Sequence, residues 1–283
     1  MQSVFSIDVE DWFHILDLPS TPDLEAWGAL PSRVERNFRG LLELLAERRA
    51  RATCFFLGWV AERFPHLVRE ALAAGHEVAS HGYAHRLVYT MSPSEFREDA
   101  SRARAILEGI SGGPVRGYRA TGFSVTEATP WFFDELAEAG YSYDSSVFPA
   151  PRQHGGLRTA PRAPFRKPVA RGEVVEFPIS VTSVAGRPLY LFGGGYLRLF
   201  PYPLVRAMAR RVLSENRPVI YYVHPREIDP EAPRLPMGAV RRFKSYVNVA
   251  GTAGKIRRVL EDFEVTTFAG WLEAHQTSIE VMA

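Results

Sequence analysis

The stretch Val4-Phe-Ser-Ile-Asp-Val-Glu-Asp11 decides the fold and the chemistry that we expect of this chain. It starts as a short apolar run, typical of a buried strand, and it ends in three carboxylates within four residues. Burial of several like charges at a strand end is costly unless a cation offsets them. Trp12 and Phe13 follow directly and indicate a partly buried site, so we count Trp12 among the candidate substrate-binding residues. An acidic surface turn is the alternative interpretation of this segment taken alone.

Other reactive residues also stand where short apolar runs stop. His81, Arg119 and His224 come at or directly after the end of such a run, as Asp8 does in the first one. In a parallel barrel the carboxyl ends of the strands share one face, and enzymes with this fold build their active sites there. Each residue alone has a structural explanation, but four in register predict a common site.

Short apolar runs alternate with longer amphipathic stretches, which favours β/α units over a β-sandwich. The expected strands are residues 4–8, 52–57, 77–80, 115–119, 174–180, 218–223 and 263–267. The expected helices are residues 32–49, 60–74, 92–110, 126–139, 202–216 and 253–262. The fold class that follows is α/β, as a distorted (β/α) barrel of about seven parallel strands.

We expect residues 1–283 to form a single domain, because the length suffices for one large α/β core and no repeat or linker divides it. Two long stretches rich in Pro, Arg and Gly interrupt the pattern, at about residues 148–172 and 186–203. Loops of this length inside a compact domain are usually functional or disordered. We interpret both as rims of a substrate groove.

The charge balance and the single cysteine exclude several classes of protein. The net charge is +2, from 34 basic and 32 acidic residues without a long run of one sign, so no nucleic-acid partner is indicated. Cys54 is the only cysteine, which excludes a disulfide framework and a multi-cysteine metal site. Neither a signal peptide nor a transmembrane segment is evident. We expect a soluble protein that is cytoplasmic or peripheral to the membrane.

His81-Gly-Tyr-Ala-His85 carries the second chemical signal. The i, i+4 spacing brings two imidazoles to one side of a helical turn, as two ligands of one metal require. With one carboxylate of the acidic segment they make an open facial site that leaves room for water and substrate. A remaining carboxylate can act as the base that deprotonates the water. A capped turn with exposed histidines is the alternative.

Three further motifs follow: Gly117-Tyr-Arg-Ala-Thr-Gly-Phe123, Tyr143-Asp-Ser-Ser-Val-Phe-Pro149 and Tyr222-Val-His-Pro-Arg-Glu-Ile-Asp229. With these five motifs in order, the chain resembles the NodB-type polysaccharide deacetylases, also called carbohydrate esterase family four. It is particularly similar to the exosortase-associated (PEP-CTERM) subgroup found with bacterial exopolysaccharide gene clusters. The resemblance runs through nearly the whole chain and implies the NodB-homology type of distorted barrel.

The resemblance implies that Asp8 is the catalytic base and that His81 and His85 are metal ligands. The family's third ligand is a carboxylate that follows the base, usually at the next position or two residues on. Because Val9 occupies the next position, the ligand is Glu10 or Asp11. Glu10 matches the variants with one intervening residue, whereas Asp11 has the commoner side chain, and both stay candidates.

The later motifs imply the remaining catalytic roles. Arg119 corresponds to an arginine that pairs with the catalytic aspartate, and a backbone N–H near Phe123 is then a candidate oxyanion donor. His224 corresponds to a histidine that protonates the leaving amine, and Asp144 to an aspartate that holds this histidine as the imidazolium. A surface ion pair for Arg119 and a turn cap for Asp144 are the alternatives.

Some positions depart from the commonest family pattern or have an open role. Many relatives have proline where Thr121 stands and tryptophan where Arg226 stands. His154 lies where relatives often carry a histidine, and we expect it to contact substrate or approach the metal. Residues 241–248 mix basic and aromatic side chains, which suits either contact with a sugar chain or an exposed helix end.

The resemblance thus implies a metal-dependent hydrolase that removes N-acetyl groups from an amino-sugar-containing oligo- or polysaccharide, in exopolysaccharide biosynthesis. The partner is an N-acetylated glycan. The cofactor is a divalent metal, with zinc the first choice and cobalt, nickel or iron compatible with the same ligands. Two alternatives stay open: a related amidohydrolase that acts on a small amide, and a catalytically inactive carbohydrate-binding protein.

Overall fold

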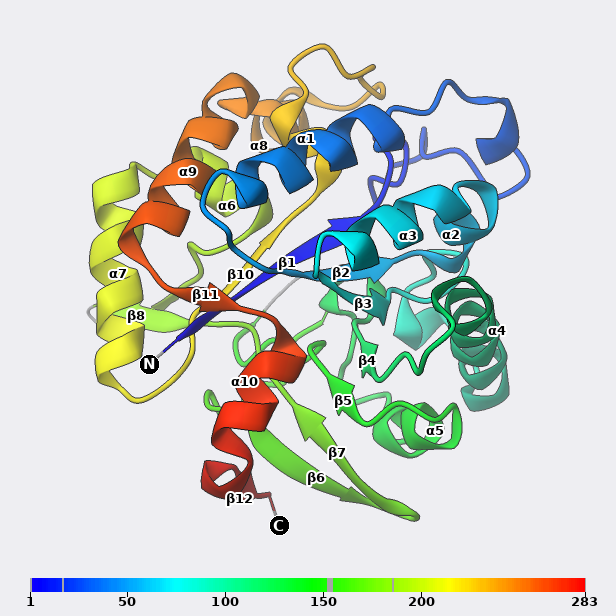
Figure 1. The fold of residues 1–283 in the computed structure, drawn as a ribbon, viewed down its shortest axis with the longest axis vertical. Coiled ribbons are helices and arrows are strands. Elements are labelled where there is room, and N and C mark those ends of the chain that lie inside the picture. Colours follow the sequence, from blue (N-terminus) through cyan, green and yellow to red (C-terminus); the bar gives the residue numbers. More distant parts are fainter. Residues whose placement is uncertain (1, 17, 152–154, 185, 283) are drawn as a thin grey trace.

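A computed structural model describes residues 2–16, 18–151, 155–184 and 186–282. A ten-stranded sheet runs through its centre in the order β10-β1-β2-β3-β4-β5-β7-β6-β12, with β11 also paired to β1 (Figure 1). The strands of this sheet are β1 (Ser3–Val9), β2 (Thr53–Phe56), β3 (Glu77–Ser80), β4 (Gly117–Tyr118), β5 (Tyr143–Asp144), β6 (Phe165–Val169), β7 (Gly172–Glu176), β10 (Ile220–Val223), β11 (Val265–Thr266) and β12 (Glu280–Val281). A separate hairpin joins β8 (Thr182–Val184) to β9 (Arg187–Leu189).

The seven neighbouring strands from β10 to β7 pair in parallel. This confirms the predicted α/β fold with a mostly parallel sheet. Strand β6 departs from the pattern, because it forms an antiparallel hairpin with β7. Strand β1 lies between β10 and β2 and is buried along its whole length, so the residues at its carboxyl end come to lie between two other strand ends.

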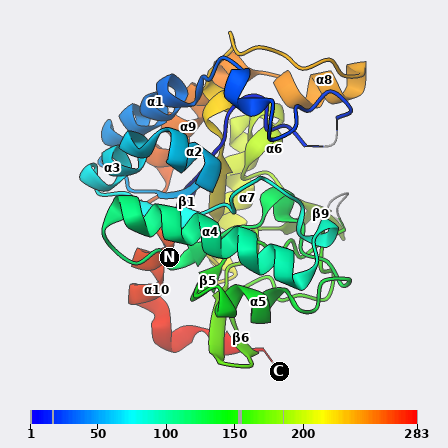
Figure 2. The ribbon, with the colours of Figure 1, turned by 90° about the vertical axis from the view of Figure 1, so that its right-hand side faces the viewer.

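Helices surround the strands on their outer side (Figures 1 and 2). They are α1 (Val34–Ala46), α2 (Gly58–Arg63), α3 (Pro65–Ala73), α4 (Pro93–Ser111), α5 (Phe132–Glu138), α6 (Gly194–Leu199), α7 (Tyr202–Ser214), α8 (Ala239–Tyr246), α9 (Thr252–Asp262) and α10 (Phe268–His275). Neighbouring helices contact each other in the order α7, α9, α1, α3, α4 and α5, which makes one continuous outer layer. None of the helices in the described ranges has the length and apolar character that a membrane span requires.

Two predicted helices differ from the structure. The helix expected over residues 60–74 is divided into α2 and α3, because Phe64 adopts φ −128° and ψ 59° and Pro65 then begins a new helix. A proline ring inside a helix would clash with the preceding turn and remove a hydrogen bond, so the break falls in front of it. The helix expected over 126–139 starts only at Phe132.

The two stretches predicted to be long loops contain regular structure. Strand β6 lies within residues 148–172, and β9 and α6 lie within 186–203. The sequence of β6, Phe165-Arg-Lys-Pro-Val169, has a proline in its centre, which argues against a strand when read alone. Pairing with β7 on one side and β12 on the other overrides this local preference.

Candidate active site

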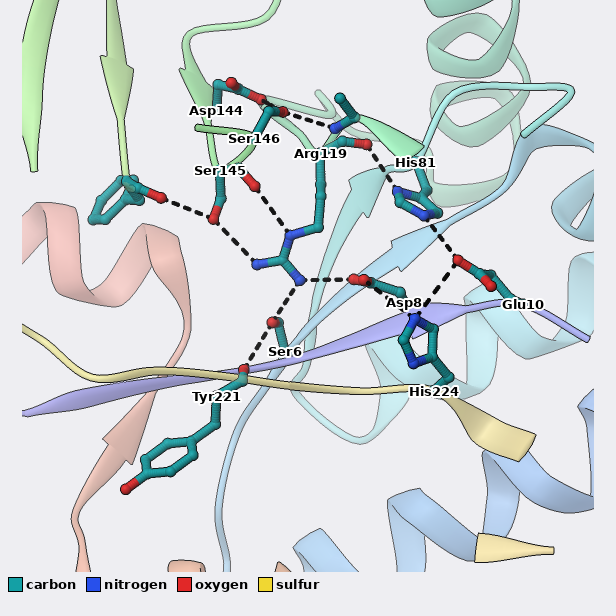
Figure 3. A network of polar contacts seen from close by, with 12 residues as sticks. Ser6, Asp8, Glu10, His81, Arg119, Asp144, Ser145, Ser146, Tyr221 and His224 are labelled. Atoms are coloured by element: carbon teal, nitrogen blue, oxygen red, sulfur yellow. Dashed lines mark hydrogen bonds and ion pairs between the residues drawn. The ribbon is translucent and has the colours of Figure 1, made fainter. Parts of the chain in front are cut away.

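The four reactive residues that end apolar runs meet at one edge of the sheet (Figure 3). Asp8 lies near the carboxyl end of β1, His81 directly follows β3, Arg119 directly follows β4, and His224 directly follows β10. Because these strands are parallel, their carboxyl ends share one face of the molecule. The structure thus brings these four residues to one face, where the sequence places them.

Glu10 lies between two histidines in a buried cluster. Nε2 of His81 and Nε2 of His85 lie 3.0 and 2.9 Å from the same Glu10 oxygen, Oε1. Nδ1 of His81 lies 2.8 Å from the backbone oxygen of Arg119, which can only accept, so in the neutral ring Nδ1 carries the proton and Nε2 a lone pair. A lone pair that faces a carboxylate oxygen needs a cation between them. Two imidazole nitrogens and one carboxylate therefore fit a divalent metal.

The local backbone and charges support this cluster. His85 adopts φ 52°, a left-handed conformation that is uncommon for a residue other than glycine and that tends to occur at functional sites. Burial raises the pKa of the Glu10 carboxyl, but the neighbouring imidazoles of His85, His224 and His81 hold this pKa well below its ordinary value.

Asp8 forms a fully buried ion pair with Arg119. Nη1 of Arg119 lies 2.7 Å from Oδ1 of Asp8 and 2.8 Å from Oγ of Ser6. The other guanidinium nitrogens donate to the backbone oxygen and the hydroxyl of Ser145, both at 3.2 Å, and the group lies 4.2 Å from the centre of the Phe55 ring. This pairing is as predicted, and burial of both partners excludes the surface ion pair considered for Arg119. Arg119 thus fixes the direction of the Asp8 carboxylate.

His224 faces the same centre and has a carboxylate behind it. Its Nε2 lies 3.8 Å from Oδ2 of Asp8 and from Oε1 of Glu10, while its Nδ1 lies 3.6 Å from Oε1 of Glu227. Burial lowers the pKa of His224, but Glu10 and Glu227 together raise it above its ordinary value. Burial raises the pKa of Glu227, and the Arg198 guanidinium, 2.6 Å away, and His224 reverse this effect and bring the pKa to about 2. An ionised carboxylate therefore stands behind the imidazole.

Two family models cover most of the chain. Residues 28–143 match the model described as polysaccharide deacetylase. This segment belongs to the polysaccharide deacetylase family. The match contains His81, His85 and Arg119 and begins after Asp8 and Glu10. Residues 145–273 match a domain of unknown function, DUF3473, and the sheet of the deacetylase segment continues into it where β5 pairs with β7.

Comparisons with known proteins agree with this family and fold. A peptidoglycan-N-acetylglucosamine deacetylase of Bacillus cereus is 30% identical over 101 residues, which are 36% of this chain and 46% of the relative, so the match spans less than half of that protein. The structure of a protein from Mycobacterium smegmatis described as a polysaccharide deacetylase has a TM-score of 0.66 at 20% identity and covers 99% of this chain and 93% of its own. The structure of a family 4 carbohydrate esterase pseudoenzyme from Bacillus anthracis has a TM-score of 0.51 at 13% identity. This match covers 99% of our chain and 66% of the pseudoenzyme chain. Since the fold also occurs in a pseudoenzyme, activity has to be argued from the site.

Asp11 does not join the cluster of Glu10, His81 and His85. Its carboxylate accepts hydrogen bonds from Oγ of Ser32 at 2.5 Å and from the backbone N–H of Arg33 at 3.1 Å, at the start of α1. Between the two carboxylates that the sequence left open, only Glu10 contacts the histidines. Asp11 as a metal ligand is therefore not supported.

We expect Asp11→Ala to destabilise the protein without loss of the metal. Removal of a carboxylate that satisfies the first N–H groups of a helix costs about 0.5–2 kcal/mol. The free energy of unfolding in urea, measured on metal-free protein, should fall by this amount, and stoichiometric zinc binding should persist. Loss of zinc binding by a folded Asp11→Ala protein would instead make Asp11 a ligand.

Asp144 does not contact His224. It lies in register with Glu176 across β5 and β7, and its Oδ1 accepts a hydrogen bond from Oγ of Ser146 at 2.5 Å. The predicted role of Asp144 behind the histidine is therefore wrong in geometry, and Glu227 occupies that place. The three-residue spacing from His224 to Glu227, with the Glu227 side chain accepting from the His224 backbone N–H at 3.2 Å, is the sequence signal that this prediction missed.

The buried pair of Asp144 and Glu176 should make stability fall as pH rises. Burial raises the pKa of Asp144 to about 6, and burial together with the neighbouring Asp144 raises the pKa of Glu176 well above its ordinary value. A carboxyl whose pKa is higher in the folded than in the unfolded state stabilises the fold while it is protonated, at low pH. This stabilisation is lost as pH rises through about 6 and above, where the carboxyls ionise.

We expect Glu176→Gln to reduce the loss of unfolding free energy between pH 5 and pH 8, as measured by urea titration. The matched control is Glu173→Gln, an exposed position on the same strand, which should keep the pH dependence of the unchanged protein. Equal pH dependence in Glu176→Gln and the control would contradict this assignment.

The site opens into a pocket of about 280 Å³. Its lining residues come from the ends of β1, β3 and β10 and the turns that follow these strands, including residues 14–16 and 226–227. Further lining residues are Gly122 and Phe123, members of 194–199, and members of α8. The predicted rim at 186–203 thus lies at the pocket, whereas the described residues of 148–172 are not among its lining residues.

The three predicted substrate-binding residues have different outcomes. Phe123 lines the pocket, but its own N–H donates to the Ala120 oxygen at 3.0 Å, so this N–H is engaged and does not serve as the oxyanion donor. Trp12 is buried against Phe13, donates from Nε1 to a backbone oxygen of residue 31 at 2.9 Å, and does not line the pocket. His154 lies outside the described residues.

Proposed function

We propose that this chain is a metal-dependent deacetylase that removes N-acetyl groups from an amino-sugar-containing oligo- or polysaccharide. The observation that carries the proposal is the convergence of two histidine nitrogens on one Glu10 oxygen, beside the fixed carboxylate of Asp8 and the imidazole of His224. Membership of residues 28–143 in the polysaccharide deacetylase family supports the reaction type.

Glu10, His81 and His85 would hold the metal. An ion bound there supplies Lewis acidity, which polarises the acetamide carbonyl and eases deprotonation of water. Zinc is the first choice for an open site with two nitrogen ligands and one oxygen ligand, and cobalt, nickel or iron suits the same set. A second possible set, Asp8 with Glu10 and His224, has its His224 nitrogen 3.8 Å from both carboxylates and is the less compact of the two.

The protein's own residues move the protons. Asp8, oriented by Arg119, accepts the proton of the attacking water. His224, with Glu227 behind it, donates a proton to the departing nitrogen, so that acetate and a free amine result. Removal of the buried Arg198–Glu227 pair would leave His224 without its negative partner.

The biological setting belongs to the same proposal. The curated relative from Bacillus cereus is named for N-acetylglucosamine in peptidoglycan. The motifs of this chain resemble those of the subgroup found with exopolysaccharide gene clusters, and we therefore propose an acetylated glycan intermediate of exopolysaccharide biosynthesis as the substrate.

The test is acetate release from a panel of N-acetylhexosamine oligosaccharides and small amides, with metal-stripped protein and with protein reloaded with zinc or cobalt. We expect equal amounts of acetate and free amine from the sugars, only after reloading. Turnover of small amides alone would favour an amidohydrolase of another specificity. Tight zinc binding without release from any substrate would contradict the enzyme proposal and leave a sugar-binding protein.

A further inference from the structure

Buried nitrogens without a protein partner are concentrated at the pocket. Among the described residues that line the pocket, five side chains have a buried polar atom without a hydrogen bond, and in each of them this atom is a nitrogen. The five atoms are His14 Nε2, Arg198 Nε, His224 Nδ1, Arg226 Nε and Arg241 Nε. No side-chain oxygen of the described lining residues is buried without a hydrogen bond. Two of these side chains already have a carboxylate beside them, because Nδ1 of His224 lies 3.6 Å from Glu227 and Arg198 is paired with Glu227. Buried polar groups in native proteins are almost always paired, so the nitrogens of His14, Arg226 and Arg241 call for a ligand that brings acceptors.

His14 lines the pocket and carries its ring proton on Nε2. Its Nδ1 accepts a hydrogen bond from the backbone N–H of Asp11 at 3.0 Å. A backbone nitrogen can only donate, so Nδ1 holds the lone pair and Nε2 the proton of a neutral ring. This tautomer cannot offer Nε2 to a metal, and His14 is not part of either candidate ligand set. Its Nε2 is therefore a buried donor that no described protein group accepts.

Arg226 and Arg241 both line the pocket. Neither forms a salt bridge with a described residue. Nη2 of Arg241 donates to the backbone oxygen of Leu16 at 2.9 Å, which holds α8 against the segment that contains His14 (Figure 2). Arg226 lies two residues after His224, and its charge acts on His14 and on Glu227 as well.

The carboxylates of the pocket do not neutralise these two arginines. Asp8 is paired with Arg119, and Glu227 is paired with Arg198. Glu10 lies against Nε2 of His81 and Nε2 of His85 and belongs to the proposed metal site. The charges of Arg226 and Arg241 therefore have no paired carboxylate among the described residues of the pocket.

We propose that His14, Arg226 and Arg241 bind an anionic oxygen group, a phosphate or a carboxylate, that the acetylated sugar carries near its acetamide. This inference rests on the proposed function and narrows its substrate to an anionic N-acetylated sugar. A guanidinium group matches the geometry of both anions through two parallel N–H···O bonds, and the neutral imidazole N–H adds a third donor. Exposed Lys244 of α8 adds a cation at the pocket.

The test compares binding of three related sugars to zinc-loaded Asp8→Asn protein, by titration calorimetry. N-acetylglucosamine is neutral, N-acetylglucosamine 1-phosphate carries a phosphate, and N-acetylmuramic acid carries a carboxylate. We expect at least one anionic sugar to bind about 10-fold or more tightly than the neutral one, with a preference that weakens as salt increases. The better of the two anionic sugars identifies the anion.

The double variant Arg226→Met and Arg241→Met should lose this preference. Arg242→Met is the matched control. Arg242 is an exposed residue of α8, the helix that contains Arg241, and the Arg242 side chain does not line the pocket. If the double variant fails to fold, the pair of Arg→Lys changes keeps the charges without the planar fork and should lower the preference in part. Equal binding of all three sugars by the unchanged pocket would overturn the proposal. A clear anion preference of the Asp8→Asn protein, with no acetate release from any sugar by zinc-loaded protein that retains Asp8, would support this binding site and count against the deacetylase function.

Discussion

Asp8→Asn is expected to lower kcat for deacetylation by roughly 10²–10⁴-fold, the usual range for the loss of a positioned general base. Asparagine has nearly the same shape as aspartate but cannot take a proton from water. Arg119 would keep its contacts with Ser6 and Ser145 and would thus stay in place. The measurement is kcat at a fixed zinc content for the unchanged and variant proteins.

The metal content of the same variant separates the two candidate ligand sets. If Glu10, His81 and His85 hold the ion, Asp8→Asn keeps stoichiometric zinc. If Asp8 is itself a ligand, with Glu10 and His224, the variant loses zinc and its inactivity reports a missing metal. Asp11→Ala is a suitable control in the same segment, because its carboxylate faces α1 and not the histidines.

The sequence predicted the parts of the site that follow from strand periodicity. Asp8, His81, Arg119 and His224 stand at ends of short apolar runs, and parallel pairing brings such ends together whatever the details of the loops. The choice between Glu10 and Asp11 depends on the turn after β1. In this turn the backbone N–H of Glu10 donates to the backbone oxygen of Asp8, and the Asp11 carboxylate reaches the start of α1. Spacing alone does not encode this turn.

The partner of His224 was missed for a similar reason. Motif order assigned Asp144, which lies at the end of its strand but is in register with Glu176. Glu227 becomes the partner because a short turn after β10 brings it back to His224 and because Arg198 compensates its buried charge. Arg198 belongs to α6, inside a stretch that the sequence predicted to be a loop. A tertiary ion pair between distant segments leaves no periodic signal in either one.

Glu227→Gln is expected to lower kcat by about 10–100-fold, as is typical when the group that orients an essential histidine is lost. It should also change the pH profile. His224 acts as an acid only while protonated, so activity is lost as pH rises through its pKa. Since Glu227 helps to raise this pKa, its neutral replacement should move the alkaline limb of kcat to lower pH.

Asp144→Asn is the matched control for this prediction, because the resemblance gave Asp144 the role that the geometry gives to Glu227. We expect the Asp144 variant to keep the alkaline limb of the unchanged protein, since its side chain bonds to Ser146 and lies beside Glu176, away from His224. A shifted limb in Asp144→Asn together with an unshifted limb in Glu227→Gln would reverse the assignment. Arg198→Met offers an independent check, because this change removes the cation that keeps Glu227 charged. The variant should shift the alkaline limb of kcat in the same direction as Glu227→Gln.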